Sequence, residues 1–242
     1  PRNSRPPSRG KAGTRLKMAR LRFPAQSDCR KSVRPLATSS TAGNRSSITR
    51  GTLKTVDPTR SVAQLKFTDT PAEPLGHAGG GAALMERLLD RAAVLVAFEQ
   101  VGGAQAALDM AREYAVGRFA FGRPIASFQA IKHKLADMYV AVELARSNAF
   151  YAAWALSTDA PELPVAAAAA RVSASEAYFH AAKENIQTHG GMGFTWEFDC
   201  HLHYRRAKLL ALMRGSVPRW KDLLISRIEA RADAAPTAAA HA

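Results

Sequence analysis

A seam of apolar side chains between residues 128 and 149 limits how this chain can fold more than any other feature. Its members recur at steps of three and four without a break: Phe128, Ile131, Leu135, Met138, Val142, Ala145 and Ala149. That spacing places them on one face of an α-helix. A helix with one apolar face buries it against other helices. The segment from the Gly122-Arg123-Pro124 break to about residue 157 is therefore predicted to be one helix of a bundle.

Similar patterns predict helices on both sides of this segment. A long helix is expected over residues 82–117, and a third opens after Pro161 and Pro164 and runs to about residue 188. Two shorter helices are expected over residues 198–213 and 216–231. The side chains of the first helix expected to face the core are Leu84, Leu88, Leu95, Phe98, Val101 and Leu108. The predicted fold class is all-α, an antiparallel four-helix-type bundle over residues 80–231, with a disordered tail over 232–242.

The net charge of +14 belongs to the N-terminal segment. Residues 1–50 hold 13 Lys and Arg and a single acid, Asp28, whereas the rest of the chain holds 21 basic and 19 acidic residues. Residues 1–55 are rich in Arg, Ser and Pro and lack apolar periodicity, so we expect them to be disordered. The nearly neutral remainder argues against a nucleic-acid-binding protein.

The origin of the basic segment stays open on sequence grounds. Its acid-poor composition resembles an organellar transit peptide, but it lacks a clear amphipathic helix. A nucleic-acid-binding arm is a second reading. The third, which the abrupt change near Thr55 favours, is a non-native stretch such as a shifted reading frame produces.

Residues 61–67 alternate imperfectly between apolar and polar, as a strand does, and lie between turn signals. Because one strand is not stable alone, residues 56–78 are read as the remnant of a β-domain whose other strands are missing. No run of about 18 apolar residues occurs, so no membrane span is predicted. Two distant cysteines, Cys29 and Cys200, fit a reducing compartment, taken as the bacterial cytoplasm rather than the mitochondrial matrix.

Two segments carry residues suited to a phosphate-bearing or flat ligand. Near residue 120, Arg118 offers a guanidinium fork, Phe121 a stacking face and Gln129 an amide. The simpler reading is a helix corner with an arginine at the helix end. The second segment is Gln187, Thr188, His189, Gly190 and Gly191, where glycines interrupt a helical pattern. Its simpler reading is a glycine cap, and its glycines do not form a dinucleotide fingerprint because they follow a helix, not a strand.

Histidines and basic residues near the C-terminus have simpler structural readings. His189 is read as a packed or hydrogen-bonding histidine, and His201 and His203 lie on different helix faces, which argues against a shared metal. The run 204–208, YRRAK, is read as a solvated basic face that leads to the turn Arg214-Gly215-Ser216.

Together these motifs resemble the C-terminal half of the acyl-CoA dehydrogenases, flavoenzymes that introduce an α,β double bond into acyl-CoA thioesters. The resemblance covers about residues 55–230. It rests on DPTR at 57–60, VGGAQAALDMAREYAVGRFAFGRPIASFQAIKHKLADM at 101–138 and QTHGGMGFTWEFDCHLHYRRAKLL at 187–210.

The resemblance implies a bundle that builds dimer and tetramer contacts, with FAD lying across a subunit boundary. Arg118 would meet the FAD pyrophosphate, with Phe121 and Gln129 near the adenylate. Residues Gln187, Thr188, His189, Gly190 and Gly191 would line the FAD of the other subunit. The implied partners are acyl-CoA dehydrogenase subunits in a homo- or hetero-tetramer, with acyl-CoA as substrate of the intact protein.

Two departures from the family pattern bear on catalysis. Many members carry the base that removes the α-proton as the glutamate of a Glu-Gly-Thr turn, where this chain has Arg214-Gly215-Ser216. An arginine cannot accept a proton, and neither Glu99 nor Glu113 carries a convincing motif for the role, so no catalytic residue is predicted. The parts that hold the flavin ring and most of the acyl pocket are also missing. The chain is therefore expected to be an inactive fragment of such an enzyme. Two alternatives stay open: a subunit of a hetero-oligomer that lacks the catalytic base, and an oligomerisation module that binds no flavin.

Overall fold

A computed structural model describes residues 47–73, 76–77 and 79–234. Within these residues the chain forms a hairpin of two strands followed by five α-helices, with two short two-residue strands at the first helical corner. No helix in the described part of the chain is long and apolar enough to cross a membrane.

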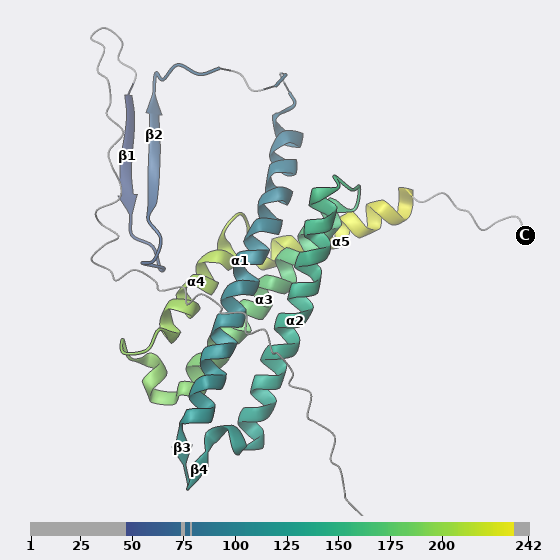
Figure 1. The fold of residues 1–242 in the computed structure, drawn as a ribbon. Helices are drawn as coiled ribbons and strands as arrows, with labels where there is room; N and C mark the ends of the chain where they lie inside the picture. The colour runs from purple at the N-terminus through teal and green to yellow at the C-terminus, as the bar shows by residue number, and fades with distance from the viewer. Residues whose placement is uncertain (1–46, 74–75, 78, 235–242) are drawn as a thin grey trace, which may run out of the picture. The chain divides into compact units, whose positions relative to one another are not determined.

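Three long helices, α1 (Gly81–Gly117), α2 (Gln129–Ser157) and α3 (Leu163–His189), form the centre of the bundle, as Figure 1 shows. Consecutive helices run in opposite directions, so α2 is antiparallel to α1 and α3. The shorter helices α4 (Cys200–Leu212) and α5 (Val217–Ala234) both pack on α3. The predicted all-α bundle is confirmed, and each predicted helix boundary lies within a few residues of the observed one, except that α2 begins at Gln129.

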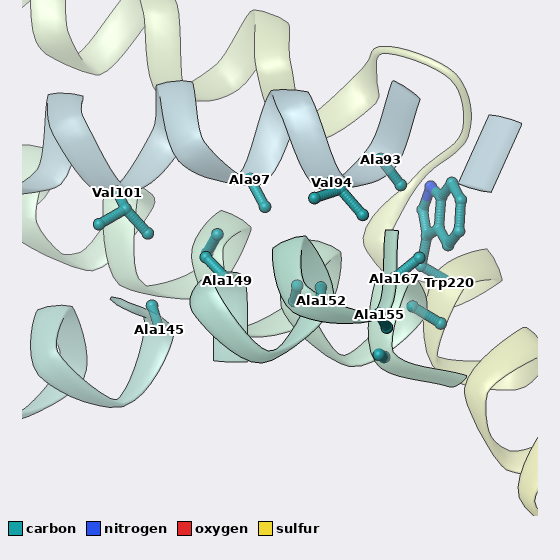
Figure 2. Packing of buried hydrophobic residues seen from close by; sticks show 14 of the residues in the cluster. Ala93, Val94, Ala97, Val101, Ala145, Ala149, Ala152, Ala155, Ala167 and Trp220 are labelled. Atoms are coloured by element: carbon teal, nitrogen blue, oxygen red, sulfur yellow. The ribbon is translucent and has the colours of Figure 1, made fainter. Parts of the chain in front are cut away.

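The core consists mainly of alanine, which lets the helices approach closely. Figure 2 shows Ala97 and Val101 of α1 pointing toward the helix that carries Ala145 and Ala149. Trp220 of α5 closes this cluster at one end and is only 3% exposed. Because α3 touches all four other helices, it is buried on several faces, and its sequence shows no single apolar stripe.

The predicted burial of the α2 seam is confirmed for its residues in the middle of the bundle, where the three long helices meet. Met138, Val142, Ala145 and Ala149 are fully buried, while Phe128, Ile131 and Leu135 near the start of the helix are half-buried. These last three lie near the end of the bundle, where fewer neighbours cover them.

The predicted core face of α1 is partly wrong. Val101 and Leu108 are buried and Phe98 is half-buried, but Leu84, Leu88 and Leu95 are 45%, 55% and 67% exposed. Small residues on a neighbouring face are buried in the bundle core instead, because helices approach most closely where side chains are short. They include Ala93, Val94, Ala97, Ala104, Ala107 and Ala111.

The predicted solitary strand pairs with a second strand that the sequence reading placed inside a disordered segment. Strand β1 (Ser47–Leu53) is antiparallel to β2 (Val62–Thr68), with Ile48 opposite Phe67. The prediction of disorder is therefore wrong for residues 47–53, because cross-strand pairing supplies order that composition does not reveal. Residues 1–46 lie outside the described part of the chain. At the other end, α5 continues to Ala234, so residues 232–234 are helical and not part of a disordered tail, and residues 235–242 are not described.

Candidate functional site

The corner between α1 and α2 holds the first predicted cluster. Strands β3 (Phe119–Ala120) and β4 (Arg123–Pro124) and the short helix η1 (Ile125–Ser127) form the connection. Phe121 adopts a φ of 53° and Gly122 a φ of 76°, which turn the chain back between the two strands. The Arg118 amide donates to the Tyr114 carbonyl at 2.8 Å, and its own carbonyl accepts from the Ile125 amide at 2.8 Å. The backbone at Arg118 is therefore fixed.

The side chains of this cluster are free to meet a ligand. Phe121 is 95% exposed, and Arg118 and Gln129 are exposed. Among the described residues, neither the Arg118 guanidinium nor the Gln129 amide has a hydrogen bond or ion pair. Arg123, by contrast, lies 4.0 Å from the Phe128 ring centroid in a cation–π contact. Arg118 is thus a cation of this corner whose guanidinium has neither a hydrogen bond nor an aromatic contact within the described residues.

The second predicted cluster ends α3 and enters the short helix η2 (Gly190–Phe194), and its residues divide into two kinds. Gln187, Gly190 and Gly191 are exposed. Thr188 and His189 are buried and bonded to their own helix. The Thr188 hydroxyl donates to the Glu184 carbonyl at 2.7 Å, and His189 Nδ1 donates to the Asn185 carbonyl at 2.9 Å. A role for the Thr188 and His189 side chains at a ligand stays a prediction.

His189 joins the two clusters at one end of the bundle. Its ring stacks on Tyr114 at 4.1 Å between centroids, one helical turn before Arg118. Burial lowers the pKa of His189, so the ring is neutral at pH 7, as expected of a packed histidine. A second link is the ion pair between Lys134 of α2 and Glu184 of α3, at 2.7 Å. The ends of all three long helices therefore meet near both clusters, although no hydrogen bond or ion pair joins the clusters directly within the described residues.

The α3–α4 connection borders an open groove of about 470 Å³ that sequence reasoning missed. Two of its aromatic residues, Phe194 and Trp196, are 81% and 66% exposed, and the Arg205 guanidinium lies 5.0 Å from the Trp196 ring. No spacing rule brings residues 196 and 205 together, because the loop before α4 decides their proximity. The groove is lined by Lys183, Ile186, Gln187, Gly193, Phe194, Trp196, His201, Tyr204 and Arg205.

Arg206, read from the sequence as part of a solvated face, belongs instead to an ionic network with the DPTR segment. It pairs with Asp57, whose side chain is fully buried, and with Glu99 at 2.8 Å. Arg60 also pairs with Glu99 at 2.8 Å. Burial lowers the pKa of Arg206, but the bonds to Glu99 and Asp57 outweigh it and raise that pKa overall. The prediction was wrong for Arg206 because its partners lie far away in the sequence.

The turn Arg214-Gly215-Ser216 carries a guanidinium, which cannot accept a proton. Arg214 is exposed with a φ of 64°, and Gly215 follows with a φ of 119°. Glu99 is paired with Arg60 and Arg206, and Glu113 is an exposed residue of α1 without a hydrogen bond or ion pair to any residue that the structure describes. The first two sequence segments therefore carry exposed polar groups, and Arg214 in the turn after α4 cannot act as a base.

Comparison with known proteins now identifies the fold. The model of the acyl-CoA dehydrogenase C-terminal domain matches residues 79–225, which include every helix but the last turns of α5. This chain belongs to the acyl-CoA dehydrogenase family. The acyl-CoA dehydrogenase IpdE2 of Mycobacterium tuberculosis is 47% identical over 153 residues, which are 63% of this chain and 43% of that protein. Human mitochondrial short-chain specific acyl-CoA dehydrogenase is 38% identical over 64% of this chain and 38% of its own length.

Solved acyl-CoA dehydrogenase structures share the fold. Butyryl-CoA dehydrogenase from Megasphaera elsdenii is 32% identical with a TM-score of 0.71 over 75% of this chain and 49% of its own. A structure described as an FAD-dependent dehydrogenase is 27% identical, with a TM-score of 0.71 over 75% of this chain and 50% of its own. The chain thus spans less than half the length of the two curated acyl-CoA dehydrogenases compared here, and about half of these solved chains.

Proposed function

We propose that this chain supplies the oligomerisation bundle of an FAD-dependent acyl-CoA dehydrogenase and part of the FAD site of a neighbouring subunit. The observation that carries the proposal is the set of free groups at one end of the bundle. Arg118, Phe121, Gln129 and Gln187 are all exposed there, on backbone that hydrogen bonds hold in place.

The exposed groups fit an adenylate diphosphate. A free guanidinium pairs with phosphate oxygens in a bidentate manner, and an exposed ring and two amides suit a purine. Gly190 has a φ of 60°, and nothing lies within 4 Å of where a Cβ would stand at Gly190 or Gly191. Backbone is therefore open to close approach by a ligand at these positions.

The chain's own residues would bind and orient the cofactor but not move the substrate proton. FAD, when bound in an acyl-CoA dehydrogenase, accepts the hydride from the substrate β-carbon. Arg214 cannot take the α-proton, since a guanidinium has no acceptor. Desaturation of an acyl-CoA thioester would then need a carboxylate from elsewhere, in a partner subunit or in the rest of a longer protein.

A second candidate function follows from Arg214 itself. A catalytically silent subunit of a hetero-oligomeric acyl-CoA dehydrogenase would keep the cofactor contacts and lose the base, and an arginine in the place of the family's glutamate agrees with such a subunit. One similar solved structure, the Tcur3481-Tcur3483 steroid ACAD G363A variant, carries the names of two proteins in its own, and it is 26% identical with a TM-score of 0.70. A neighbouring reading frame that encodes a related chain with a Glu-Gly-Thr turn, and that co-purifies with this chain, would support this function. Absence of such a chain would count against it.

The binding proposal is tested with ADP and FAD on the whole 242-residue chain. We expect ADP binding in isothermal titration calorimetry and retention of yellow flavin after gel filtration with FAD. Arg118→Ala should weaken ADP binding about tenfold or more, because it removes charge-assisted hydrogen bonds to phosphate. The matched control is Arg112→Ala, an exposed arginine of α1 that should leave binding unchanged.

Light scattering during the same gel filtration reports assembly. A homo- or hetero-tetramer with acyl-CoA dehydrogenase subunits in a bacterial cytoplasm is part of the proposal. An assembled but colourless chain without ADP affinity would favour a flavin-free oligomerisation module. Equal binding by Arg118→Ala and the unaltered chain would remove Arg118 from the site.

A further inference from the structure

Arg171 in the middle of α3 is a buried cation without a carboxylate partner in the described part of the chain. Its side chain is 1% exposed, and burial lowers its pKa to about 10. Taking a guanidinium out of water is costly when no opposite charge compensates it. The hydrogen bonds of the guanidinium therefore have to offset this cost.

The Arg171 guanidinium is instead surrounded by neutral acceptors. Nη1 donates to Gln100 Oε1 of α1 at 2.7 Å and to Ser175 Oγ at 2.5 Å. Gln100 Nε2 donates to Ser175 Oγ at 3.1 Å, and the Ser175 hydroxyl donates to the Arg171 carbonyl at 2.6 Å. These bonds hold one side of the fork in a fixed orientation between α1 and α3.

The other side of the fork reaches the C-terminal end of α4. Nη2 donates to the Leu210 carbonyl and, at 2.9 Å, to the Met213 carbonyl. The last carbonyls of a helix lack partners within the helix and carry its partial negative charge, so a cation is favoured there. Arg171 therefore caps α4 from a different helix, 39 and 42 residues away in the sequence.

The turn that follows Met213 has an unusual backbone. Arg214 and Gly215 are consecutive residues with φ angles of 64° and 119°, and an L-residue in the first of these conformations costs free energy. Inside the turn, the bond from the Gly215 amide to the Leu212 carbonyl is long, at 3.3 Å. A firm anchor just before Arg214 is thus needed to keep the turn in one conformation.

We infer that Arg171 is a positioning residue that fixes the α4–α5 turn, and through it the direction of Arg214, from the interior of the bundle. The hydrogen bonds by which Arg171 holds the turn do not depend on a bound ligand. Its relevance to a catalytic or silent site rests on the proposed function, because only there does Arg214 stand in the place of a catalytic base.

The test compares Arg171→Met and Arg171→Lys in the whole chain by hydrogen–deuterium exchange. Arg171→Met should speed exchange of amides in residues 211–220 about tenfold or more, with little change in α2. Arg171→Lys should restore part of the protection, because an ammonium can donate to one or two carbonyls but lacks the fork. The control Arg146→Met removes a half-buried arginine of α2 that bonds Glu143 and Gln105, and it should leave the turn unchanged.

Trypsin provides a second readout at the same place. Cleavage after Arg214 should be faster in Arg171→Met than in the unaltered chain, while cleavage after Arg112 should not change. Faster exchange spread evenly over all helices, or no change at the turn, would overturn the inference. If Arg171→Met does not fold, the same comparison is made with Arg171→Lys. Amide exchange at the turn of Arg171→Lys that equals exchange in the unaltered chain would then overturn the inference. Because no nucleotide is present, failure of this test is distinct from failure of ADP binding.

Discussion

Asp57 and Arg206, 149 residues apart in the sequence, form an ion pair in which the Asp57 side chain is fully buried. The pair ties the segment after β1 to α4, and Glu99 of α1 bonds the same guanidinium. Thr59 completes the contact, since its amide donates to Asp57 Oδ1 at 2.9 Å. The DPTR segment is therefore held on the bundle by ion pairs, one of which contains the buried Asp57 carboxylate.

Arg206→Ala should lower the free energy of unfolding by about 3–5 kcal/mol, because it leaves a buried carboxylate without its cation. Chemical denaturation measures this loss, and exchange of residues 56–68 should rise with it. The control is Arg60→Ala, whose partly exposed ion pair with Glu99 is worth about 0–1 kcal/mol. Equal losses for the two variants would show that Asp57 does not depend on Arg206.

Gly103→Ala should destabilise the bundle by about 1–3 kcal/mol through overpacking. A Cβ at this position would stand 2.4 Å from Tyr178 Cζ, where α1 and α3 approach each other. Its neighbour provides the control, since a Cβ at Gly102 meets nothing within 4 Å. Gly102→Ala should raise stability by about 0.5–1 kcal/mol, as alanine does in a helix. Thermal unfolding of both variants decides whether the close approach is real.

Acid should destabilise the fold between about pH 6.5 and 5, in part through His189 and His203. Burial lowers the pKa of each histidine below its ordinary value of about 6.5. As the pH falls below 6.5, the unfolded chain binds protons that the folded chain does not, so stability is present above this range and lost through it. His189→Phe keeps a ring against Tyr114 and should reduce the drop in unfolding temperature between pH 7 and 5.

The control for this pH dependence is His133→Gln, at an exposed position of α2, which should keep the full drop. His189→Phe also loses the bond to the Asn185 carbonyl, so its unfolding temperature should be lower at every pH. The readout is therefore the difference between the unfolding temperatures of one variant at pH 7 and at pH 5. An unchanged difference would mean that His189 does not contribute to acid sensitivity.

Gly191→Ala should weaken nucleotide binding at the proposed cofactor contact without changing the stability of the fold. A Cβ there meets nothing within 4 Å, so stability should change by less than about 0.5 kcal/mol. If a nucleotide approaches this backbone closely, ADP binding should still weaken. Gly193→Ala behaves differently, since its Cβ would lie 2.6 Å from the Ile186 carbonyl oxygen, and it should destabilise the loop itself. Unchanged ADP binding by a folded Gly191→Ala chain would argue against contact at this residue.

The bundle and its helix boundaries follow from local sequence, whereas the partners of individual side chains do not. The α2 seam predicts its own burial at Met138 and Val142 because periodicity is a property of neighbouring residues. The α1 prediction failed at Leu88 and Leu95 because the face that meets α3 is chosen by how closely two helices can approach. Composition also placed β1 in a disordered segment, since pairing with β2 is not visible in either strand alone.

The sequence by itself determined the fold class and the family, because helical periodicity and motif spacing are encoded over short stretches. Tertiary structure alone decided that Thr188 and His189 turn into their own helix while Gln187 and Arg118 stay free. It also decided that Arg171 is buried against carbonyls and that Arg206 is half-buried against carboxylates. The packing of helices that are distant in the sequence determines which groups surround a charged side chain. Those groups decide whether the side chain is free to bind a ligand, pairs with another segment or holds a turn in place.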